Sequence, residues 1–218
     1  MNLVIFGPPG SGKGTYAIRL APILRLVKIS TGDLLRENVK NNTEVGRLAK
    51  TYMDRGELVP DSVTNKVLVE RLGKPDAIKG VIFDGYPRTV EQAVFLEGHV
   101  SIDAIVKLNV SKEIIVRRLS ARRFCKKCGE IYNTLFLKPK VDGVCDKCGG
   151  ELIQRNDDKP EVVVDRFDVY EKQSTPVLEY YKNKGTQFVE VTTPSVDTAP
   201  DEMVEKILEG LKKLNLVK

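Results

Sequence analysis

A glycine-rich segment follows the first apolar run of the chain. Residues 7–13 read Gly-Pro-Pro-Gly-Ser-Gly-Lys and lie between the apolar run 3–6 and a helical pattern that begins at Lys13. The N–H groups of such a loop and the positive end of the helix dipole bind phosphate oxygens, and the lysine adds a point charge. A Ser or Thr usually follows that lysine, whereas this sequence has Gly14 there and a hydroxyl one residue later, at Thr15. The pattern predicts a phosphate-binding loop, with a simple glycine- and proline-rich turn as the alternative.

A second group of polar residues follows another apolar run, 81–83. Residues 84–89 read Asp-Gly-Tyr-Pro-Arg-Thr, and in open parallel sheets ligands bind beyond the carboxyl ends of the strands. Asp84 is therefore placed to hold Mg²⁺ through water, and Arg88 to make a forked contact with a phosphate. A structural turn with a surface salt bridge is the alternative interpretation.

All four cysteines lie in two CxxC pairs. Cys125 and Cys128 form the first pair, Cys145 and Cys148 the second, and 16 residues separate the pairs. This spacing indicates a four-cysteine zinc site, which is structural because four thiolates leave no open coordination position. Metal binding would fold residues 122–158, which have little apolar core of their own. Disulfides and a redox CxxC are the alternatives; because we expect no secretion signal, disulfides are disfavoured.

Apolar runs that alternate with helical patterns predict a parallel α/β sheet with helices on both faces. Strands are expected at 3–6, 26–29, 80–84, 104–108 and 188–191, and helices at 13–24, 34–39, 44–54, 61–72, 90–97, 112–121, 161–182 and 201–214. Residues 30–33 are expected to cap the helix that follows them. The alternation stops at 122–158, which we interpret as an insert.

Length and composition fit one large domain with small inserts. The chain has 218 residues, of which 41% are hydrophobic and 30% charged. No apolar run approaches the ~18 residues of a membrane span, and we expect a cytoplasmic protein that does not contact membranes. The net charge of +5 suits an anionic partner, either nucleotides or nucleic acid, although a lysine-rich surface would also account for it.

Several motifs together resemble the adenylate kinase family. They are GPPGSGKGT at residues 7–15, STGD at 30–33 with Arg36 close behind, DGYPRT at 84–89, Arg122-Arg123, and the late pair Arg155 and Arg166. The resemblance covers essentially the whole chain, including the insert. It implies a P-loop NTPase-type five-stranded parallel sheet with helices on both faces, a small helical segment that binds the nucleoside monophosphate, and a zinc-binding lid. The implied ranges are 1–29, 60–121 and 159–218 for the core, 30–59 for the monophosphate-binding segment and 122–158 for the lid.

The resemblance also implies an activity and the residues that carry it. The activity is reversible phosphoryl transfer from Mg²⁺-ATP to AMP, giving two ADP, with a structural zinc ion. The residues implied to bind ATP are Gly10, Ser11, Gly12, Lys13, Gly14, Thr15, Arg118, Arg122, Ile131 and Tyr132. Those implied to bind AMP are Thr31, Arg36, Glu57, Leu58, Val59, Gly85, Tyr86, Pro87, Arg88, Gln92, Arg155 and Arg166, with the amide of Gln92 on the adenine edge. Those implied to act on the transferring group are Lys13, Arg88, Arg122, Arg155 and Arg166.

This arrangement of cations suits phosphoryl transfer. The transition state is loose and spreads its charge over three oxygens, so catalysis consists mainly of positioning and electrostatic stabilisation. The AMP phosphate is already ionised and needs no strong general base, but water must be excluded, which is the physical reason for a lid. Asp157 and Asp158, beside the expected hinge, are placed to anchor the closed lid.

Three other interpretations stay open. One is a monophosphate kinase with a different or broader acceptor, GMP or UMP and CMP, since few residues read the base. Another is an RNA-binding zinc-ribbon protein that uses a P-loop, although its knuckles have few aromatic residues for base stacking. The last is a nucleotide sensor without activity. The sequence names no site in 192–200; the resemblance favours a monomer that binds no nucleic acid, and the oligomeric state is left open.

Overall fold

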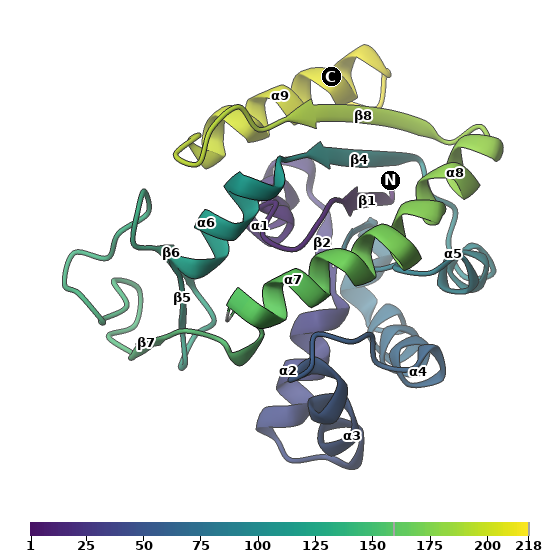
Figure 1. Ribbon diagram of the computed structural model, residues 1–218. Coiled ribbons are helices and arrows are strands. Elements are labelled where there is room, and N and C mark those ends of the chain that lie inside the picture. The colour runs from purple at the N-terminus through teal and green to yellow at the C-terminus, as the bar shows by residue number, and fades with distance from the viewer. Residues whose placement is uncertain (159, 218) are drawn as a thin grey trace.

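The main sheet has five parallel strands. The computed structural model describes residues 1–158 and 160–217, so the expected core boundary at 159 and the last residue, 218, lie outside the described residues. The strands are β1 (Leu3–Phe6), β2 (Val27–Ser30), β3 (Val81–Asp84), β4 (Ala104–Asn109) and β8 (Gln187–Thr192), and their order across the sheet is β2-β3-β1-β4-β8 (Figure 1). The expected five-stranded parallel sheet is therefore confirmed.

Helices cover both faces of this sheet because its strands are apolar on both sides. On one face Leu3 and Ile5 of β1 pack with α1 (Lys13–Leu24) and α9 (Pro200–Lys213). On the other face the alternate residues Val4 and Phe6 pack with α4 (Asp61–Leu72), α5 (Val90–Glu97) and α8 (Thr175–Asn183). The alternation of side chains along β1 thus divides one strand between two cores.

Two segments project away from the sheet (Figure 1). One is a pair of helices, α2 (Thr31–Lys40) and α3 (Glu44–Met53), which has a small core of its own around Leu35 and Ala49. The other is the expected insert, which contains a three-stranded antiparallel sheet ordered β6-β5-β7. Its strands are β5 (Arg122–Cys125), β6 (Ile131–Asn133) and β7 (Leu152–Ile153). Helix α6 (Lys112–Ser120) leads from the core into this insert.

The long helix expected over 161–182 is interrupted in the structure. It consists of α7 (Pro160–Val169), a π-helical stretch at Tyr170–Ser174 and α8. The helix expected at 34–39 begins earlier, at Thr31, because the Oγ of Ser30 accepts a hydrogen bond from the N–H of Asp33 at 3.3 Å and caps its start. The strands of the insert and a short 3₁₀ helix at Pro75–Lys79 were not expected. A second short 3₁₀ helix lies at Asn156–Asp158.

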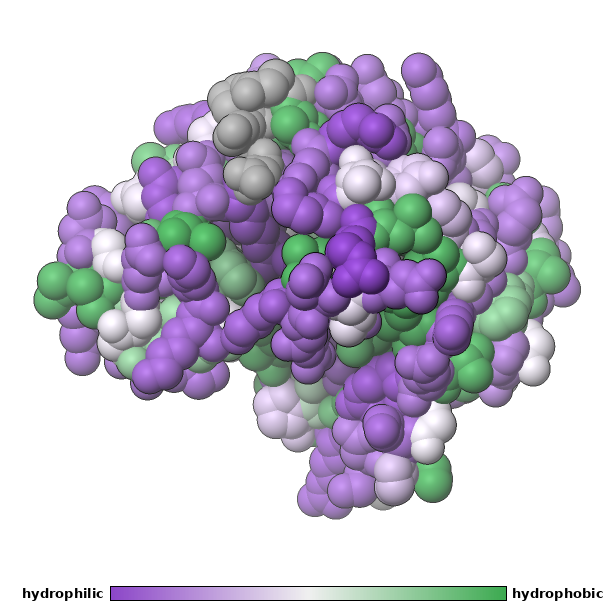
Figure 2. Space-filling view, turned by 90° about the horizontal axis from the view of Figure 1, so that it is seen from below, coloured by the Kyte–Doolittle hydropathy of each residue, from purple (hydrophilic) through white to green (hydrophobic). Residues whose placement is uncertain are grey.

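Hydrophilic side chains predominate on the face of the molecule shown in Figure 2, with hydrophobic residues in separate groups among them. Within residues 1–158 and 160–217, no helix combines the length and the apolar character that crossing a bilayer requires.

We expect the substitution Gly46→Ala to destabilise the projecting helical pair. A Cβ at this position would collide with the backbone carbonyl of Asn38, where α3 starts against the end of α2. Overpacking of this kind costs about 1–3 kcal/mol, measurable as a shift in urea unfolding. Gly98→Ala is the matched control, because a Cβ there meets only the carbonyl oxygen of Phe95, at 3.4 Å. Equal stability of the two variants would contradict the prediction.

Candidate active site

A large cavity lies at the carboxyl ends of β1 and β3, and a smaller one adjoins it. The sequence-predicted residues that line the large cavity are Gly10, Gly12, Lys13, Gly14, Thr15, Arg36, Leu58, Asp84, Gly85, Tyr86, Pro87, Arg88, Arg118, Arg122, Ile131, Tyr132, Arg155 and Arg166. The smaller cavity is lined by Thr31, Glu57, Val59 and Gln92, and shares Arg36, Leu58, Gly85, Arg88 and Arg166 with the larger one. The structure thus brings nearly every sequence-predicted site residue to one connected region.

Ser11 is the exception among the predicted loop residues. It lines neither of these two cavities, and its N–H donates to the carbonyl oxygen of Pro8 at 3.1 Å. Its hydroxyl is buried and has no hydrogen-bond partner among the described residues. Ser11 therefore lies behind the loop surface that faces the cavity.

A steric constraint explains why position 14 is glycine. A Cβ on Gly14 would lie 3.1 Å from Oδ2 of Asp84, so a larger residue would push against this carboxylate. The first hydroxyl after Lys13 is therefore that of Thr15, which follows Gly14 in α1 and also lines the large cavity. The departure from the usual loop pattern keeps Asp84 close to the start of the helix.

Lys28 is a cavity residue that the sequence analysis missed. Its Nζ lies 2.7 Å from Oδ2 of Asp33 and 3.4 Å from Oδ2 of Asp84, and the residue lines the large cavity. Lys28 is the second residue of β2 and lies level with Ile82, two residues before Asp84 in β3, so no motif at a strand end could have identified it.

Besides Lys28 and Arg118, the cations that line the large cavity are Lys13, Arg36, Arg88, Arg122, Arg155 and Arg166. They come from different parts of the chain. Arg36 lies on α2, Arg122 and Arg155 in the insert, and Arg166 on α7. The Nζ of Lys13 donates to the carbonyl oxygens of Gly7 and Pro8 at 2.6 and 2.8 Å, which neutralises none of its charge.

Carboxylates offset part of this positive charge. The guanidinium of Arg122 forms a bidentate ion pair with the carboxylate of Asp158. Its Nε donates to Oδ2 at 2.8 Å, and its Nη2 donates to Oδ1. Arg166 pairs with Asp157 at 3.0 Å and also reaches Asp158 at 3.4 Å. Burial by itself would lower the pKa of Arg122, but the neighbouring carboxylate of Asp158 outweighs it and the pKa is raised. These contacts join Asp157 and Asp158 to one cation of the insert and one cation of α7; that the pair anchors a closed lid stays a prediction.

Lys13, Arg88 and Arg155 have lowered pKa values. Burial is the main cause that lowers the pKa of Lys13 to about 7; Arg88, Arg166 and Arg122 contribute to the shift, while Asp84 opposes it. Burial and neighbouring arginines also lower the pKa of Arg88 to about 10 and that of Arg155 to about 9. The cavity wall therefore holds more positive charge than its own carboxylates compensate, and it favours a ligand with several negative charges.

Gln92 and Tyr86 belong to a polar network under the smaller cavity. Oε1 of Gln92 accepts from the backbone N–H of Arg88 at 2.8 Å, and its Nε2 donates to Oδ1 of Asp61 at 2.6 Å. The hydroxyl of Tyr86 donates to Oδ1 of Asn65 at 2.7 Å, and its ring packs in the core. Asp61 and Asn65 carried no motif that the sequence analysis could have used.

Arg118 is held by the segment for which the sequence named no site. Its Nε donates to the carbonyl oxygen of Val196 at 3.0 Å, and its Nη2 to that of Ser195 at 3.2 Å. Its guanidinium also lies over the ring of Phe136, 5.4 Å from the centroid. Thr198 and Pro200 line the same part of the cavity. Residues 192–200 thus contribute to the site, which only the folded chain reveals.

The four cysteine sulfur atoms form one cluster. All of them lie within 4.8 Å of one another, with 3.5 Å between Sγ of Cys125 and Cys148 and 3.6 Å between Sγ of Cys128 and Cys145. All four cysteines are free. A tetrahedral zinc site with ~2.3 Å Zn–S bonds has ~3.8 Å between its sulfur atoms, so these residues fit a thiolate-bound metal. Tyr132 supports the cluster, since its hydroxyl contacts Sγ of Cys145 at 3.6 Å.

A parallel sheet, a glycine-rich loop at the end of its first strand and a wall of buried cations define a P-loop protein that binds phosphate groups. The sequence model of the adenylate kinase family matches residues 5–186. Adenylate kinases of similar sequence include those of Caldanaerobacter subterraneus subsp. tengcongensis (46% identity, 98% of this chain and 95% of the relative) and Archaeoglobus fulgidus (46%, 97% and 100%). That of Methanosarcina mazei is 50% identical over 85% of this chain and 88% of its own. The chain belongs to the adenylate kinase family.

We expect the binding of inorganic tripolyphosphate at pH 8 to take up protons. Lys13, with a pKa of about 7 in the free protein, is mostly neutral at this pH, and a polyanion beside it stabilises the protonated form. Affinity should fall as the pH rises above 7. Calorimetry in two buffers of different ionisation enthalpy measures the uptake, and Lys13→Met should abolish most of it. Binding without proton uptake would contradict the low pKa.

The same shift predicts a change of stability with pH. The pKa of Lys13 is lowered from 10.5 to about 7 in the folded protein, so the unfolded chain binds more protons between these values. The contribution of Lys13 to stability therefore increases as the pH rises through this window. The difference in unfolding free energy between the protein and Lys13→Met, followed from pH 6 to pH 10, should show this trend.

Proposed function

We propose that this protein is an ATP:AMP phosphotransferase that converts Mg²⁺-ATP and AMP reversibly into two ADP. The observation that carries the proposal is the gathering of five arginines and Lys13 around two adjoining cavities, next to the phosphate-binding loop. Two cavities suit two nucleotides, and the cations where they meet suit the phosphates between them. Membership of the adenylate kinase family supports this function.

We assign ATP to the side of the large cavity that the loop and the insert form. The N–H groups of Gly10, Gly12, Gly14 and Thr15 and the charge of Lys13 would hold its phosphates. The donor base would lie between Arg118, Ile131, Tyr132 and the segment around Thr198, all of which line this cavity. Ser11 is assigned a structural part, because its side chain is buried behind the loop.

We assign AMP to the smaller cavity. Arg36, Arg88 and Arg166 line both cavities and would meet its phosphate, and Arg155, which lines the large cavity, would approach from the insert. The hydroxyl of Thr31, which donates to the carbonyl oxygen of Gly85 at 3.0 Å, would border the nucleoside. Leu58 and Val59 would close over the base, with Glu57 beside them, and Gln92 would read its edge. Tyr86 and Pro87 would support this pocket from beneath.

The side chains act by positioning and by electrostatics. A loose transition state carries its charge on the equatorial oxygens, and Lys13, Arg88, Arg122, Arg155 and Arg166 surround the place where we put it. Lys13, Arg88 and Arg155 are buried without full compensation, so they interact more strongly with developing negative charge than they would in water. The acceptor phosphate is already ionised, so none of these side chains has to remove a proton from it.

Asp84 and Thr15 are the residues that fit Mg²⁺. Carboxylate and hydroxyl oxygens are the ligands this ion prefers, commonly through water, and both residues line the cavity beside Lys13. When bound with ATP, Mg²⁺ would neutralise charge on the transferring phosphates. The ion pair with Lys28 would hold the carboxylate of Asp84 in position, and the absence of a side chain at Gly14 leaves space for it.

We further propose that residues 30–59 and 122–158 close over the core domain. The cations of the site come from all three parts, so closure would bring their charges together only around phosphate groups. The closed insert would also exclude water, which otherwise competes with AMP as the acceptor. Zinc held by Cys125, Cys128, Cys145 and Cys148 would stabilise the insert, whose apolar core consists of only a few residues.

The first test is ADP formation from Mg²⁺-ATP with AMP, GMP, CMP or UMP as separate acceptors, beside an ATP-only control. We expect rapid production with AMP alone. Comparable rates with several acceptors would replace the proposal with a broader monophosphate kinase. Turnover no higher than the control with every acceptor, in a zinc-replete preparation, would refute the kinase function.

We expect Arg88→Met to lower kcat for AMP phosphorylation by roughly 10²–10³-fold, the usual effect of removing one group that stabilises transition-state charge. Arg71→Met is the matched control, since Arg71 pairs with Asp76 and lines neither of the two cavities. The kcat of this control variant should stay within about twofold of that of the parent enzyme. Similar losses in both variants would show that the effect of Arg88→Met is not specific to the site.

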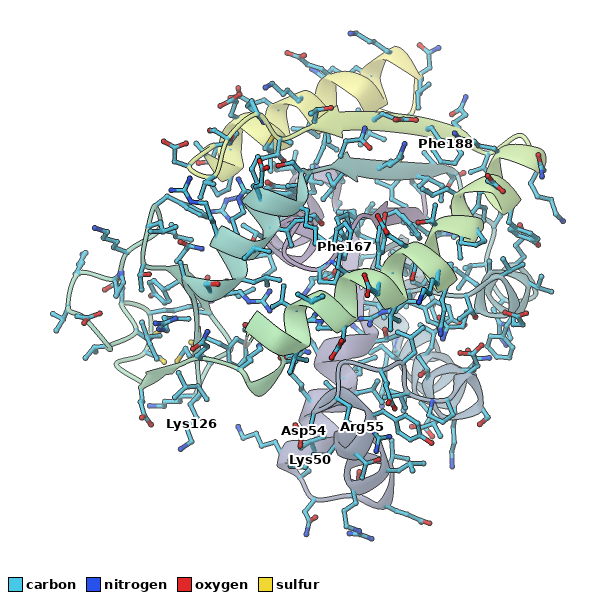
Figure 3. All side chains as sticks on the ribbon, viewed as in Figure 1. Lys50, Asp54, Arg55, Lys126, Phe167 and Phe188 are labelled. Carbon is cyan, nitrogen blue, oxygen red and sulfur yellow. The ribbon has the colours of Figure 1, made fainter. Side chains whose placement is uncertain are left out.

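We expect Cys128→Ser to lose most of the bound zinc and to expose residues 122–158 to proteolysis. Lys126→Ser is the matched control, because Lys126 stands in the same CxxC pair but points into solvent (Figure 3). Metal content after gel filtration, together with limited proteolysis, measures both effects. Full metal content and unchanged protease resistance in Cys128→Ser would refute the assignment of these cysteines as ligands.

A further inference from the structure

The side-chain amide of Gln92 lies between two partners that allow it only one orientation. Its Oε1 accepts from the backbone N–H of Arg88 at 2.8 Å, and its Nε2 donates to Oδ1 of Asp61 at 2.6 Å. A backbone N–H can only donate and a carboxylate can only accept. If the amide rotated by half a turn, oxygen would face the carboxylate and N–H would face N–H. Gln92 is 2% exposed, so water offers no replacement for these partners.

Asp61 is itself fixed. Its second oxygen, Oδ2, accepts from the hydroxyl of Thr89 at 2.9 Å, and that hydroxyl accepts from the N–H of Gln92 at 3.1 Å to cap α5. Asp61 is also the first residue of α4, where the helix dipole favours a negative charge. The carboxylate thus joins the beginnings of two helices and has little freedom to turn away from Gln92.

The fixed amide still has one N–H and one oxygen lone pair unused. A primary amide offers two donors and two acceptor positions, and the protein uses one of each. Gln92 lines the smaller cavity, so the unused pair is available to a base there. Adenine carries an amino donor at C6 beside an accepting ring nitrogen, whereas a 6-oxopurine has a carbonyl there and a ring N–H. The first pattern complements an amide of defined orientation and the second complements its reverse.

We propose that Asp61 is the positioning residue that sets the base specificity of the acceptor site. It does not touch the nucleotide, but it prevents Gln92 from turning its amide to suit a 6-oxopurine. The backbone N–H of Arg88 restricts the amide in the same way, but only proline would remove it and would also remove the Arg88 side chain. Asp61 is therefore the constraint that can be tested separately. This inference rests on the proposed function, in which AMP occupies the smaller cavity.

The test compares AMP with inosine monophosphate, which differs from AMP only at the purine C6 and N1 positions. We expect Asp61→Asn to lower the ratio of kcat/KM for AMP to kcat/KM for inosine monophosphate by about tenfold, which corresponds to about 1.4 kcal/mol. Asparagine keeps the size of the side chain but can donate as well as accept. Asp61→Ser removes the acceptor-only character in the same way, and serves if Asp61→Asn does not fold.

Two controls separate orientation from stability. Asn65→Ala removes the contact between α4 and the hydroxyl of Tyr86, which joins the same two segments without touching the Gln92 amide. It should lower the melting temperature and leave the ratio unchanged. In a Gln92→Met background, Asp61→Asn should no longer change the ratio, because the amide that it orients is gone.

The outcomes distinguish the two proposals. If the parent enzyme phosphorylates AMP and Asp61→Asn lowers both acceptors equally, Asp61 is merely structural and the inference is wrong. The inference is also wrong if Asp61→Asn changes the ratio equally with and without Gln92. If the parent enzyme phosphorylates no monophosphate, the proposed function itself fails before Asp61 is tested.

Discussion

Uncompensated positive charge in the wall of one cavity is the constraint on which the rest of this structure depends. Buried cations are costly unless they are paired, and here Asp33, Asp84, Asp157 and Asp158 pair with only part of the set. The lowered pKa values of Lys13, Arg88 and Arg155 express the remaining imbalance. A ligand with several phosphate groups supplies the missing negative charge, so binding and the stability of the site are physically linked.

The architecture brings these charges together from distant parts of the chain. Parallel strands send all their carboxyl ends to one edge of the sheet, which places the loop before α1 beside the residues that follow β3. The helical pair α2–α3 and the insert then add cations from either side (Figure 1). Neither projecting segment has a large core, so each depends on other interactions: a close backbone contact between α2 and α3 in one case, and the cysteine cluster in the other.

Charge and base recognition are organised differently in the two cavities. In the proposed function phosphates would bind to a surplus of cations from several segments, an arrangement that tolerates small movements because electrostatic attraction acts over some distance. In the proposed function the base would be recognised by a single amide, that of Gln92, whose orientation depends on short, directional hydrogen bonds within the core. The proposed closure of the projecting segments would therefore leave undisturbed the groups to which we assign recognition of the acceptor.

The sequence by itself determined the alternating strand and helix order, the phosphate-binding loop and the paired cysteines, because local periodicity and short spacings encode them. Motifs at strand ends and the family resemblance also indicated the cations that line the cavities, apart from Lys28. Only the tertiary structure decided that Ser11 turns away from the cavity, that Lys28 stands beside Asp84, and that the segment around Val196 holds Arg118. It alone placed Asp61 against Gln92, 31 residues later in the chain. Such contacts join residues that share no local pattern, and the packing of separate helices and strands sets them.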